Sequence, residues 1–372
     1  MPAPTDLRST PYSIFYSGDL ETEWIDVFGC AVPVSCGDIE AEYGALRTSV
    51  AAMEFSMLYR WDLVGEGALD AVNSVHSRDL HKLADGQIAY GVFVDDDGKM
   101  VDDVTVFRSG PDRVRVIGGN VEADDLILRT AAPDGVTVTE RRDETAQLSI
   151  QGPRSREVLQ SMTSADLSNE AMPYYTFRTG MVVGGVTGQL NRMGFTAELG
   201  YEFICGVDDV AAFGEALLEA GAGAGIRIAG AATVMMARIE GGMVMAELEY
   251  DHTSTPFECR LGWAVDFDKG PFRGRDALLA ARDAAPDRVV TVVIDGIEGA
   301  EFAPITLDGE EIGVVTMAVP SPVQGGTLGL ARVRKAAAAV GTRFEGVAGD
   351  AAFTAQVVKT PVYDPERIRV RS

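Results

Sequence analysis

The sequence predicts an α+β fold in two parts, a mixed core over residues 1–285 and a small antiparallel β-barrel over 286–372. In the first part, segments with the apolar spacing of helices are mixed with short alternating segments typical of strands. The segment 283–287, Asp-Ala-Ala-Pro-Asp, interrupts this pattern, and mainly short strands separated by turn residues follow it. A chain of 372 residues is also longer than one typical core requires.

Three helices are predicted in the core from apolar periodicity. Residues 38–52 carry apolar side chains at spacings of three and four, namely Ile39, Tyr43, Leu46 and Val50. Asp38 is a suitable N-cap for this helix because its carboxylate accepts hydrogen bonds from the first free backbone N–H groups. Residues 154–162 and 208–220 have the same pattern, and Gly221 is expected to cap the last helix.

Strands are predicted where the period changes to two. Residues 61–65 and 113–117 are the clearest examples in the core. After the break, Asp308-Gly309 and Gly325-Gly326 separate short β-rich segments, which cover 288–294, 311–317, 328–333 and 353–358. Strands of this length and spacing favour a small closed barrel as a separate unit.

The composition excludes several classes of function. The formal net charge is −24, which repels phosphate backbones and anionic lipid, so we expect neither a nucleic-acid nor a membrane partner. No apolar run has the length of a membrane span. The N-terminal residues 1–6 lack the basic and apolar regions of a secretory signal. We therefore expect a cytoplasmic protein.

The cysteines and histidines do not form a metal-ligand pattern. The four cysteines include no C-x-x-C pair, and the three histidines are scattered. Four cysteines in a chain of this length fit reduced thiols better than a disulfide framework. We expect no structural metal.

Eight segments, taken in order along the chain, carry a resemblance to a known family. They are 28–33 (FGCAVP), 46–48 (LRT), 98–104 (GKMVDDV), 151–153 (QGP), 194–202 (GFTAELGYE), 238–242 (RIEGG), 261–263 (LGW) and 272–278 (FRGRDAL). In this order and spacing they resemble the glycine-cleavage T-protein, or aminomethyltransferase, superfamily. The resemblance implies a folate-binding core of intertwined lobes with a C-terminal barrel. It also implies a one-carbon transferase that depends on tetrahydrofolate.

The resemblance assigns two carboxylates to the folate. Glu202 matches the residue that binds the amino-pyrimidinone edge, whose adjacent N–H donors suit paired bonds to a carboxylate; the alternative is a solvent-facing strand residue. Asp102 matches the aspartate near N10 and the reactive carbon, where it can stabilise developing positive charge. Its alternative is a solvated turn residue, since residues 95–97 are all aspartates.

Further folate contacts follow from the same comparison. Arg238 matches a folate-contacting arginine, although it could equally pair with Glu240 or Glu247. Phe195 occupies the place of a ligand-contacting tyrosine and keeps the ring without the hydroxyl. The resemblance also assigns Asn120 and Tyr175 to the folate site.

The donor side departs from the family pattern. The segments that differ are 54–58, 232–235 and 246–250, so the resemblance implies a retained folate side and a rebuilt donor side. Tyr250 and His252 are new polar groups there, and either could protonate the leaving oxygen of an ether donor. A sulfonium or quaternary ammonium donor would instead need a cation site, for which the candidates are Tyr59, Trp61 and Glu249.

These features favour a tetrahydrofolate-dependent demethylase as the first hypothesis. A methyl group would pass from a small O-, N- or S-methylated donor to give 5-methyltetrahydrofolate, with Asp102, Tyr250 and His252 as catalytic residues. Segments 8–12, 238–242 and 255–259 resemble the dimethylsulfoniopropionate demethylase branch more than the T-protein itself. The alternative is aminomethyl transfer in glycine cleavage, which would require a lipoyl carrier protein and agrees with the retained Asp102-Asp103 pair. A third hypothesis is a non-catalytic folate-binding protein.

Overall fold

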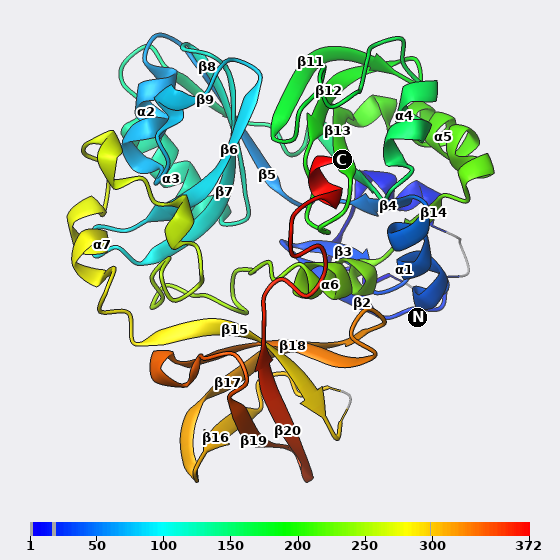
Figure 1. Cartoon of the computed structure of the whole chain (residues 1–372). Helices are drawn as coiled ribbons and strands as arrows, with labels where there is room; N and C mark the ends of the chain where they lie inside the picture. The colour runs from blue at the N-terminus through cyan, green and yellow to red at the C-terminus, as the bar shows by residue number, and fades with distance from the viewer. Residues whose placement is uncertain (1–2, 17–19, 298) are drawn as a thin grey trace.

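The computed structural model describes residues 3–16, 20–297 and 299–372. Met1 and Pro2, on which the expectation about the N-terminal segment partly rests, lie outside the described residues. The described chain forms a two-lobed core and a barrel, with the barrel below both lobes in Figure 1. The predicted fold class, α+β with a C-terminal antiparallel barrel, is confirmed.

An eleven-stranded sheet runs through both lobes of the core. In sheet order its strands are β14 (Arg227–Ala229), β4 (Ala51–Glu54), β10 (Thr145–Gln151), β13 (Gly200–Gly206), β12 (Val186–Arg192), β11 (Thr176–Val183), β6 (Gln87–Val94), β7 (Met100–Gly110), β8 (Arg113–Gly118), β5 (Tyr59–Val64) and β9 (Thr137–Glu140). The lobes join at β11 and β6, where the ladder has one pair, Thr176 with Gln87. This narrow joint leaves space between the lobes.

Seven α-helices pack against the sheets in the described part of the chain. They are α1 (Ile39–Thr48), α2 (Ala68–Val75), α3 (Val121–Ala131), α4 (Ser155–Ser161), α5 (Val210–Gly221), α6 (Ala231–Glu240) and α7 (Arg275–Ala281). Helices α2 and α3 share one apolar core with β5 to β8, and α4 and α5 share another with β10 to β13. A small sheet of β1 (Arg8–Ser9), β3 (Cys30–Pro33) and β2 (Trp24–Val27) completes the core.

The helix predicted over 38–52 is shorter than expected. Asp38 is the N-cap, and its side chain accepts hydrogen bonds from the backbone N–H groups of Glu40 and Ala41. The helix ends at Thr48, and β4 begins at Ala51. All four residues of β4 are buried, so the strand lacks the alternation that would have separated it from the helix.

The expected cap at Gly221 is also wrong by several residues. Helix α5 includes Gly221, and a short 3-10 turn carries the chain on to Gly225. Gly225 has φ +75°, the left-handed conformation that glycine adopts without steric cost. Several glycines in this segment alternate with alanines, so composition alone did not distinguish the capping one.

The C-terminal strands close into a six-stranded antiparallel barrel. In barrel order they are β15 (Asp287–Asp295), β18 (Gly326–Arg334), β17 (Glu310–Ser321), β16 (Pro304–Leu307), β19 (Arg343–Ala348) and β20 (Ala351–Val358). Since β15 begins at Asp287, we propose residue 286 as the start of the barrel unit. Four of these strands were predicted, and β16 and β19 were not.

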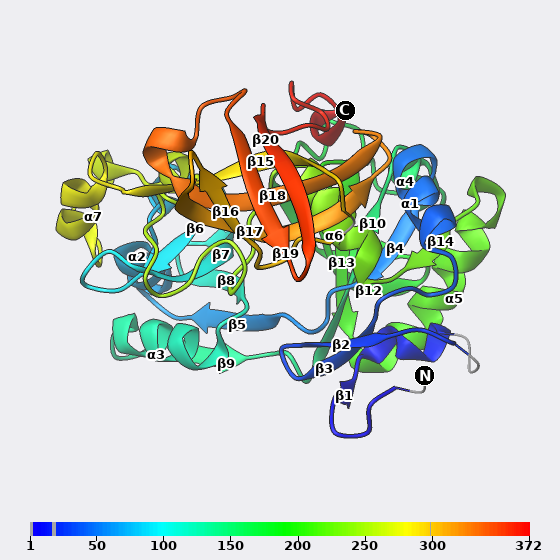
Figure 2. The ribbon, with the colours of Figure 1, turned by 90° about the horizontal axis from the view of Figure 1, so that it is seen from below.

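The barrel packs on the core through α6. Met236 and Ile239 of α6 share an apolar cluster with Val319 and Leu328 of the barrel. Seen from below, the barrel lies over the middle of the core, with α2 and α3 on one side and α4 and α5 on the other (Figure 2). The C-terminal tail then leaves the barrel and returns toward the lobes (Figure 1). It ends at Ser372, whose carbonyl accepts a hydrogen bond from Arg192 at 2.8 Å.

Two further findings concern metals and membranes. The four cysteines are free thiols, and within the described ranges no three His, Cys, Asp or Glu residues are grouped so as to hold a metal ion. None of the helices described is both long and apolar enough to cross a membrane.

Candidate functional site

A cavity of about 1640 Å³ occupies the space between the lobes and reaches the barrel side of the core. Its wall combines parts of β6, β7 and β13 with the loop 242–247 and the C-terminal tail. The volume exceeds the roughly 300–1,000 Å³ that surrounds a typical small ligand. A ligand with an extended tail would therefore fit.

Asp102 of β7 lies on this wall with its carboxylate fixed by backbone donors. Its Oδ2 accepts hydrogen bonds from the N–H of Gly119 at 2.7 Å and from the N–H of Asn120 at 3.1 Å. The side chain is 3% exposed. The two backbone N–H groups thus fix the position of this carboxyl group on the cavity wall.

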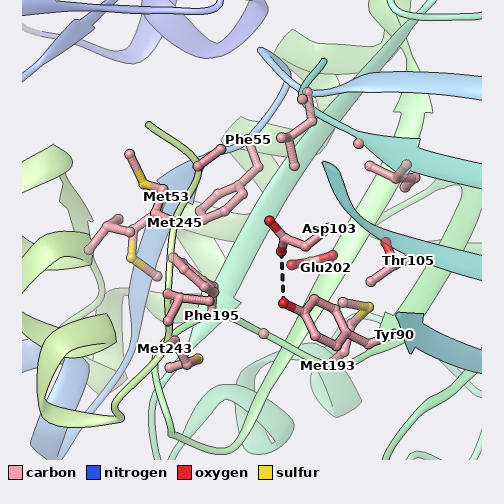
Figure 3. A pocket seen from close by; sticks show the side chains of 18 of the residues that line it. Met53, Phe55, Tyr90, Asp103, Thr105, Met193, Phe195, Glu202, Met243 and Met245 are labelled. Carbon is pink, nitrogen blue, oxygen red and sulfur yellow. Dashed lines mark hydrogen bonds between the residues drawn. The ribbon is translucent and has the colours of Figure 1, made fainter. Parts of the chain in front are cut away.

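Asp103 follows on the same strand and faces two phenols. Its Oδ2 accepts a hydrogen bond from Tyr90 Oη at 2.9 Å, and its Oδ1 accepts one from the Tyr250 hydroxyl (Figure 3 shows the Tyr90 bond). Burial, together with the charge of Asp102, raises the pKa of Asp103 to about 6. Asp103 is therefore mostly ionised at neutral pH and takes up a proton as the pH falls through about 6.

Glu202 of β13 reaches the cavity from the opposite lobe. Its Oε2 accepts a hydrogen bond from Gln147 Nε2 at 3.0 Å. Burial raises the pKa of Glu202 to about 7. No cation pairs with it among the residues whose placement is described. The carboxylate is therefore available to accept hydrogen bonds from N–H groups of a ligand.

The wall facing these carboxylates is apolar and rich in sulfur. Figure 3 shows Asp103 and Glu202 on one side, with methionine and phenylalanine side chains on the other. The apolar set comprises Met53, Phe55, Phe195, Met243 and Met245. Thioether side chains are flexible and polarizable, so this wall can adapt to a flat ring or to an alkyl chain.

Three arginines at the tail end of the cavity were missed by the sequence reasoning. Arg260, Arg367 and Arg371 all line the wall. Arg260 Nη1 is buried without a hydrogen-bond partner, and burial with nearby Arg288 and Arg367 lowers its pKa to about 10. The available signal was a basic run at the end of an otherwise acidic chain, where Arg367, Arg369 and Arg371 alternate.

The other residues expected to bind folate divide into two groups. Tyr175 and Phe195 line the cavity, as do Asp102 and Glu202. Asn120 and Arg238 do not lie on the cavity wall. Asn120 instead caps α3 through its side chain and holds Asp102 through its backbone.

Arg238 is fully buried in an ion pair. Its Nη1 lies 2.8 Å from Glu249 Oε2 and 3.1 Å from the carbonyl of Met243. Both members of the pair have fully buried side chains. The expected alternatives, Glu240 and Glu247, are not its partners. Arg238 therefore supports the loop that lines the cavity, and its side chain lies off the cavity wall.

The donor-side expectations for Tyr250 and His252 need correction. Tyr250 is 2% exposed and lies behind β7, where its hydroxyl donates to Asp103 and accepts from the backbone N–H of Asp103 at 3.1 Å. His252 Nδ1 lies 3.2 Å from the Met100 carbonyl. Neither residue lies on the cavity wall. The loop residues Ala246 and Glu247 line the cavity, whereas Tyr250 at the end of this loop holds Asp103, and His252 contacts the backbone of β7.

The expected cation site is likewise not formed. Trp61 is fully buried, and its Nε1 donates to Asp125 Oδ1 at 3.0 Å. Tyr59 stacks on Trp61 with 5.9 Å between ring centroids. Glu249 pairs with Arg238. None of the three candidates lies on the cavity wall.

Comparison with known proteins identifies the same two parts of the chain. Residues 18–269 match the GCVT N-terminal domain, and residues 288–364 match the glycine cleavage T-protein C-terminal barrel domain. The aminomethyltransferase of Herpetosiphon aurantiacus is 32% identical over 367 residues, covering 96% of this chain and 98% of that protein. The aminomethyltransferase of Halothermothrix orenii is 30% identical, covering 95% and 99%.

A solved structure supports the fold. The glycine cleavage system aminomethyltransferase T of Bartonella henselae superimposes with a TM-score of 0.86 and 21% sequence identity. The match covers 96% of this chain and 99% of that one. The two lobes and the barrel are therefore shared along the whole length.

Proposed function

Because the chain belongs to the glycine cleavage T-protein family and is a one-carbon transferase that uses tetrahydrofolate, we propose that its donor is an aminomethyl group on the lipoyl arm of a carrier protein. The observation that carries this proposal is the full-length similarity to aminomethyltransferases together with the cavity-facing Asp102-Asp103 pair. The demethylase hypothesis used Tyr250 or His252 to protonate the leaving oxygen of an ether donor, and neither side chain lies on the cavity wall.

The cavity has groups that fit each part of a folate. Glu202 offers a buried carboxylate that pairs with no cation in the described part of the chain, and such a group suits the adjacent N–H donors of an amino-pyrimidinone edge. Tyr175 and Phe195 supply rings on the same wall. Arg260 and Arg367 lie toward the tail, where cationic groups would pair with the carboxylates of a glutamate.

The chain's contribution to the chemistry is electrostatic. Tetrahydrofolate supplies the nitrogen nucleophiles N5 and N10 that accept the one-carbon unit. Asp102, held by two backbone N–H groups, places a fixed negative charge where positive charge develops on the reacting carbon. Tyr90 and Tyr250 orient Asp103, and because burial raises the pKa of both phenols well above its usual range, they act as hydrogen-bond donors and keep their protons.

The apolar wall opposite the carboxylates agrees with a carrier-bound arm. An alkyl chain ending in a thiol gains from burial against Met53, Met243 and Met245. The same wall would also hold a small uncharged methylated donor. This observation keeps methyl transfer, with 5-methyltetrahydrofolate as product, as the second candidate function.

An assay that separates donor classes tests the proposal. Purified protein and tetrahydrofolate are incubated either with an aminomethyl-loaded lipoyl carrier or with free O-, N- and S-methylated compounds. We expect methylene-tetrahydrofolate only with the loaded carrier. Formation of 5-methyltetrahydrofolate from a free donor, with no product from the carrier, would favour the second candidate.

A further inference from the structure

Behind the cavity wall, a third aspartate lies against Asp102. Asp124 is in the first turn of α3 and is fully buried. Neither of its carboxyl oxygens accepts a hydrogen bond from an N–H or O–H group in the described part of the chain. A buried carboxylate without a donor would cost several kcal/mol, so this placement requires an explanation.

The polar group that Asp124 meets is the carboxyl group of Asp102. A Cβ atom placed on Gly118 would lie 2.5 Å from Asp124 Oδ2 and 2.7 Å from Asp102 Oδ2, so both oxygens converge on this glycine. The two side chains are within hydrogen-bonding reach of each other. Two carboxylates cannot form such a bond unless one of them carries a proton.

The surroundings determine which of the two carries it. Asp102 accepts hydrogen bonds from two backbone N–H groups. For Asp124 the backbone of Asn120 is the group that acts to lower the pKa, and its effect is smaller than the raising effects of burial and of Asp102. Resting on the proposed role of Asp102 in one-carbon transfer, we propose that Asp124 is a neutral acid that donates its proton to Asp102. It is thus a positioning residue that fixes the catalytic carboxylate from behind.

The electrostatic environment agrees with a neutral Asp124. The charged groups that act on it are Asp102 and Asp103 of β7, both acidic, and burial together with their charge raises its pKa well above the usual range. Helix α2 and strand β9 contribute apolar side chains such as Val72 and Val138 to the core around α3. Arg129 of α3 pairs with the neighbouring Asp125 and not with Asp124.

Two substitutions separate a proton donor from a space-filling group. Asp124→Asn keeps an N–H donor of the same shape, and Asp124→Leu keeps the volume but has no donor. We expect Asp124→Leu to lower kcat about ten-fold or more, on the order of a lost positioning contact, with the Kd for tetrahydrofolate unchanged. Asp124→Asn should recover most of this loss. Equal kcat in the leucine variant and the wild type would overturn the proposal.

A second measurement needs neither a donor nor turnover. Because the folded-state pKa of Asp124 is raised, its contribution to stability is fully present below the unfolded pKa of about 3.9 and is lost as pH rises toward the folded value. Urea unfolding from pH 5 to pH 8 should therefore show that the free energy of unfolding of wild type falls relative to that of Asp124→Asn. The slope of this difference against pH should correspond to about one proton released on unfolding. Asp103 and Glu202 are common to both proteins, so their effects largely cancel.

The two measurements fail in different ways. Parallel pH profiles for wild type and Asp124→Asn would mean that Asp124 is ionised, and the inference would be wrong whatever the donor is. If the loaded carrier gives no methylene-tetrahydrofolate while the pH profiles diverge as expected, the hydrogen bond from Asp124 to Asp102 is supported and the proposed function is wrong. If Asp124→Leu does not fold, the comparison with Asp124→Asn still decides.

Discussion

Replacing Glu202 should weaken tetrahydrofolate binding in a way that depends on pH. In the free protein burial raises the pKa of Glu202 to about 7. A ligand that donates two N–H bonds binds the carboxylate, so below pH 7 a proton must leave before the ligand binds. The Kd should therefore rise about ten-fold for each pH unit below 7 and become constant above it.

The magnitude follows from the contacts that are lost. Hydrogen bonds to a charged group contribute about 1.5–3 kcal/mol, so Glu202→Ala should raise the Kd at pH 8 roughly 10- to 150-fold. Glu202→Gln keeps the shape but offers one acceptor, and it should bind weakly with no pH dependence between 6 and 8. The lost pH dependence distinguishes a direct carboxylate contact from a general disturbance of the cavity.

Isothermal titration calorimetry at several pH values checks this prediction. Glu198→Gln is the matched control, since Glu198 is also buried but pairs with Arg47 and Tyr363 and lies off the cavity wall. Folding of each variant is verified by circular dichroism. If Glu202→Gln bound tetrahydrofolate as tightly as wild type, with the same pH profile, the assignment of Glu202 to the pyrimidinone edge would be wrong.

Two other substitutions test the remaining assignments. Asp102→Asn should lower turnover about ten-fold or more with folate affinity largely kept, because a fixed charge acts on the transition state. Single-turnover kinetics measures the rate, and calorimetry measures the affinity. Unchanged turnover would mean that Asp102 has a structural role. Arg238→Met should reduce the free energy of unfolding by about 3–5 kcal/mol, because it leaves Glu249 buried without its cationic partner. Urea unfolding measures this change. A variant as stable as wild type that binds folate more weakly would show that Arg238 contacts the ligand.

The fold was largely predictable because its signals are local. The N-cap at Asp38 and the barrel strands near 288–294 and 328–333 follow from residue type and period. Strand β4 was merged into a helix because both of its faces are buried. Strand β16 was missed because it has only four residues. Strand β19 was missed although its residues alternate between exposed and buried over Arg343–Ala348.

Motif position predicted four of the residues that line the cavity, namely the carboxylates Asp102 and Glu202 and the rings of Tyr175 and Phe195. The resemblance assigned these residues to the folate, and their contact with folate stays a prediction. Tyr250 was misjudged because sequence cannot show that its loop folds beneath β7 and that its hydroxyl is already bonded to Asp103. Arg367 was missed because its position depends on the tail returning from the barrel to the core, a contact between distant parts of the chain.

The central claim is that the one-carbon unit comes from a carrier-bound aminomethyl group and passes to tetrahydrofolate in the cavity between the lobes. The most direct measurement is the ammonia released per methylene-tetrahydrofolate formed, using a lipoyl carrier loaded with a ¹³C-labelled aminomethyl group. We predict one ammonia per product, the label in the methylene carbon, and rates of both ammonia and product formation that fall together, about ten-fold or more, in Asp102→Asn. Label transfer as a methyl group, or product without ammonia, would contradict the claim.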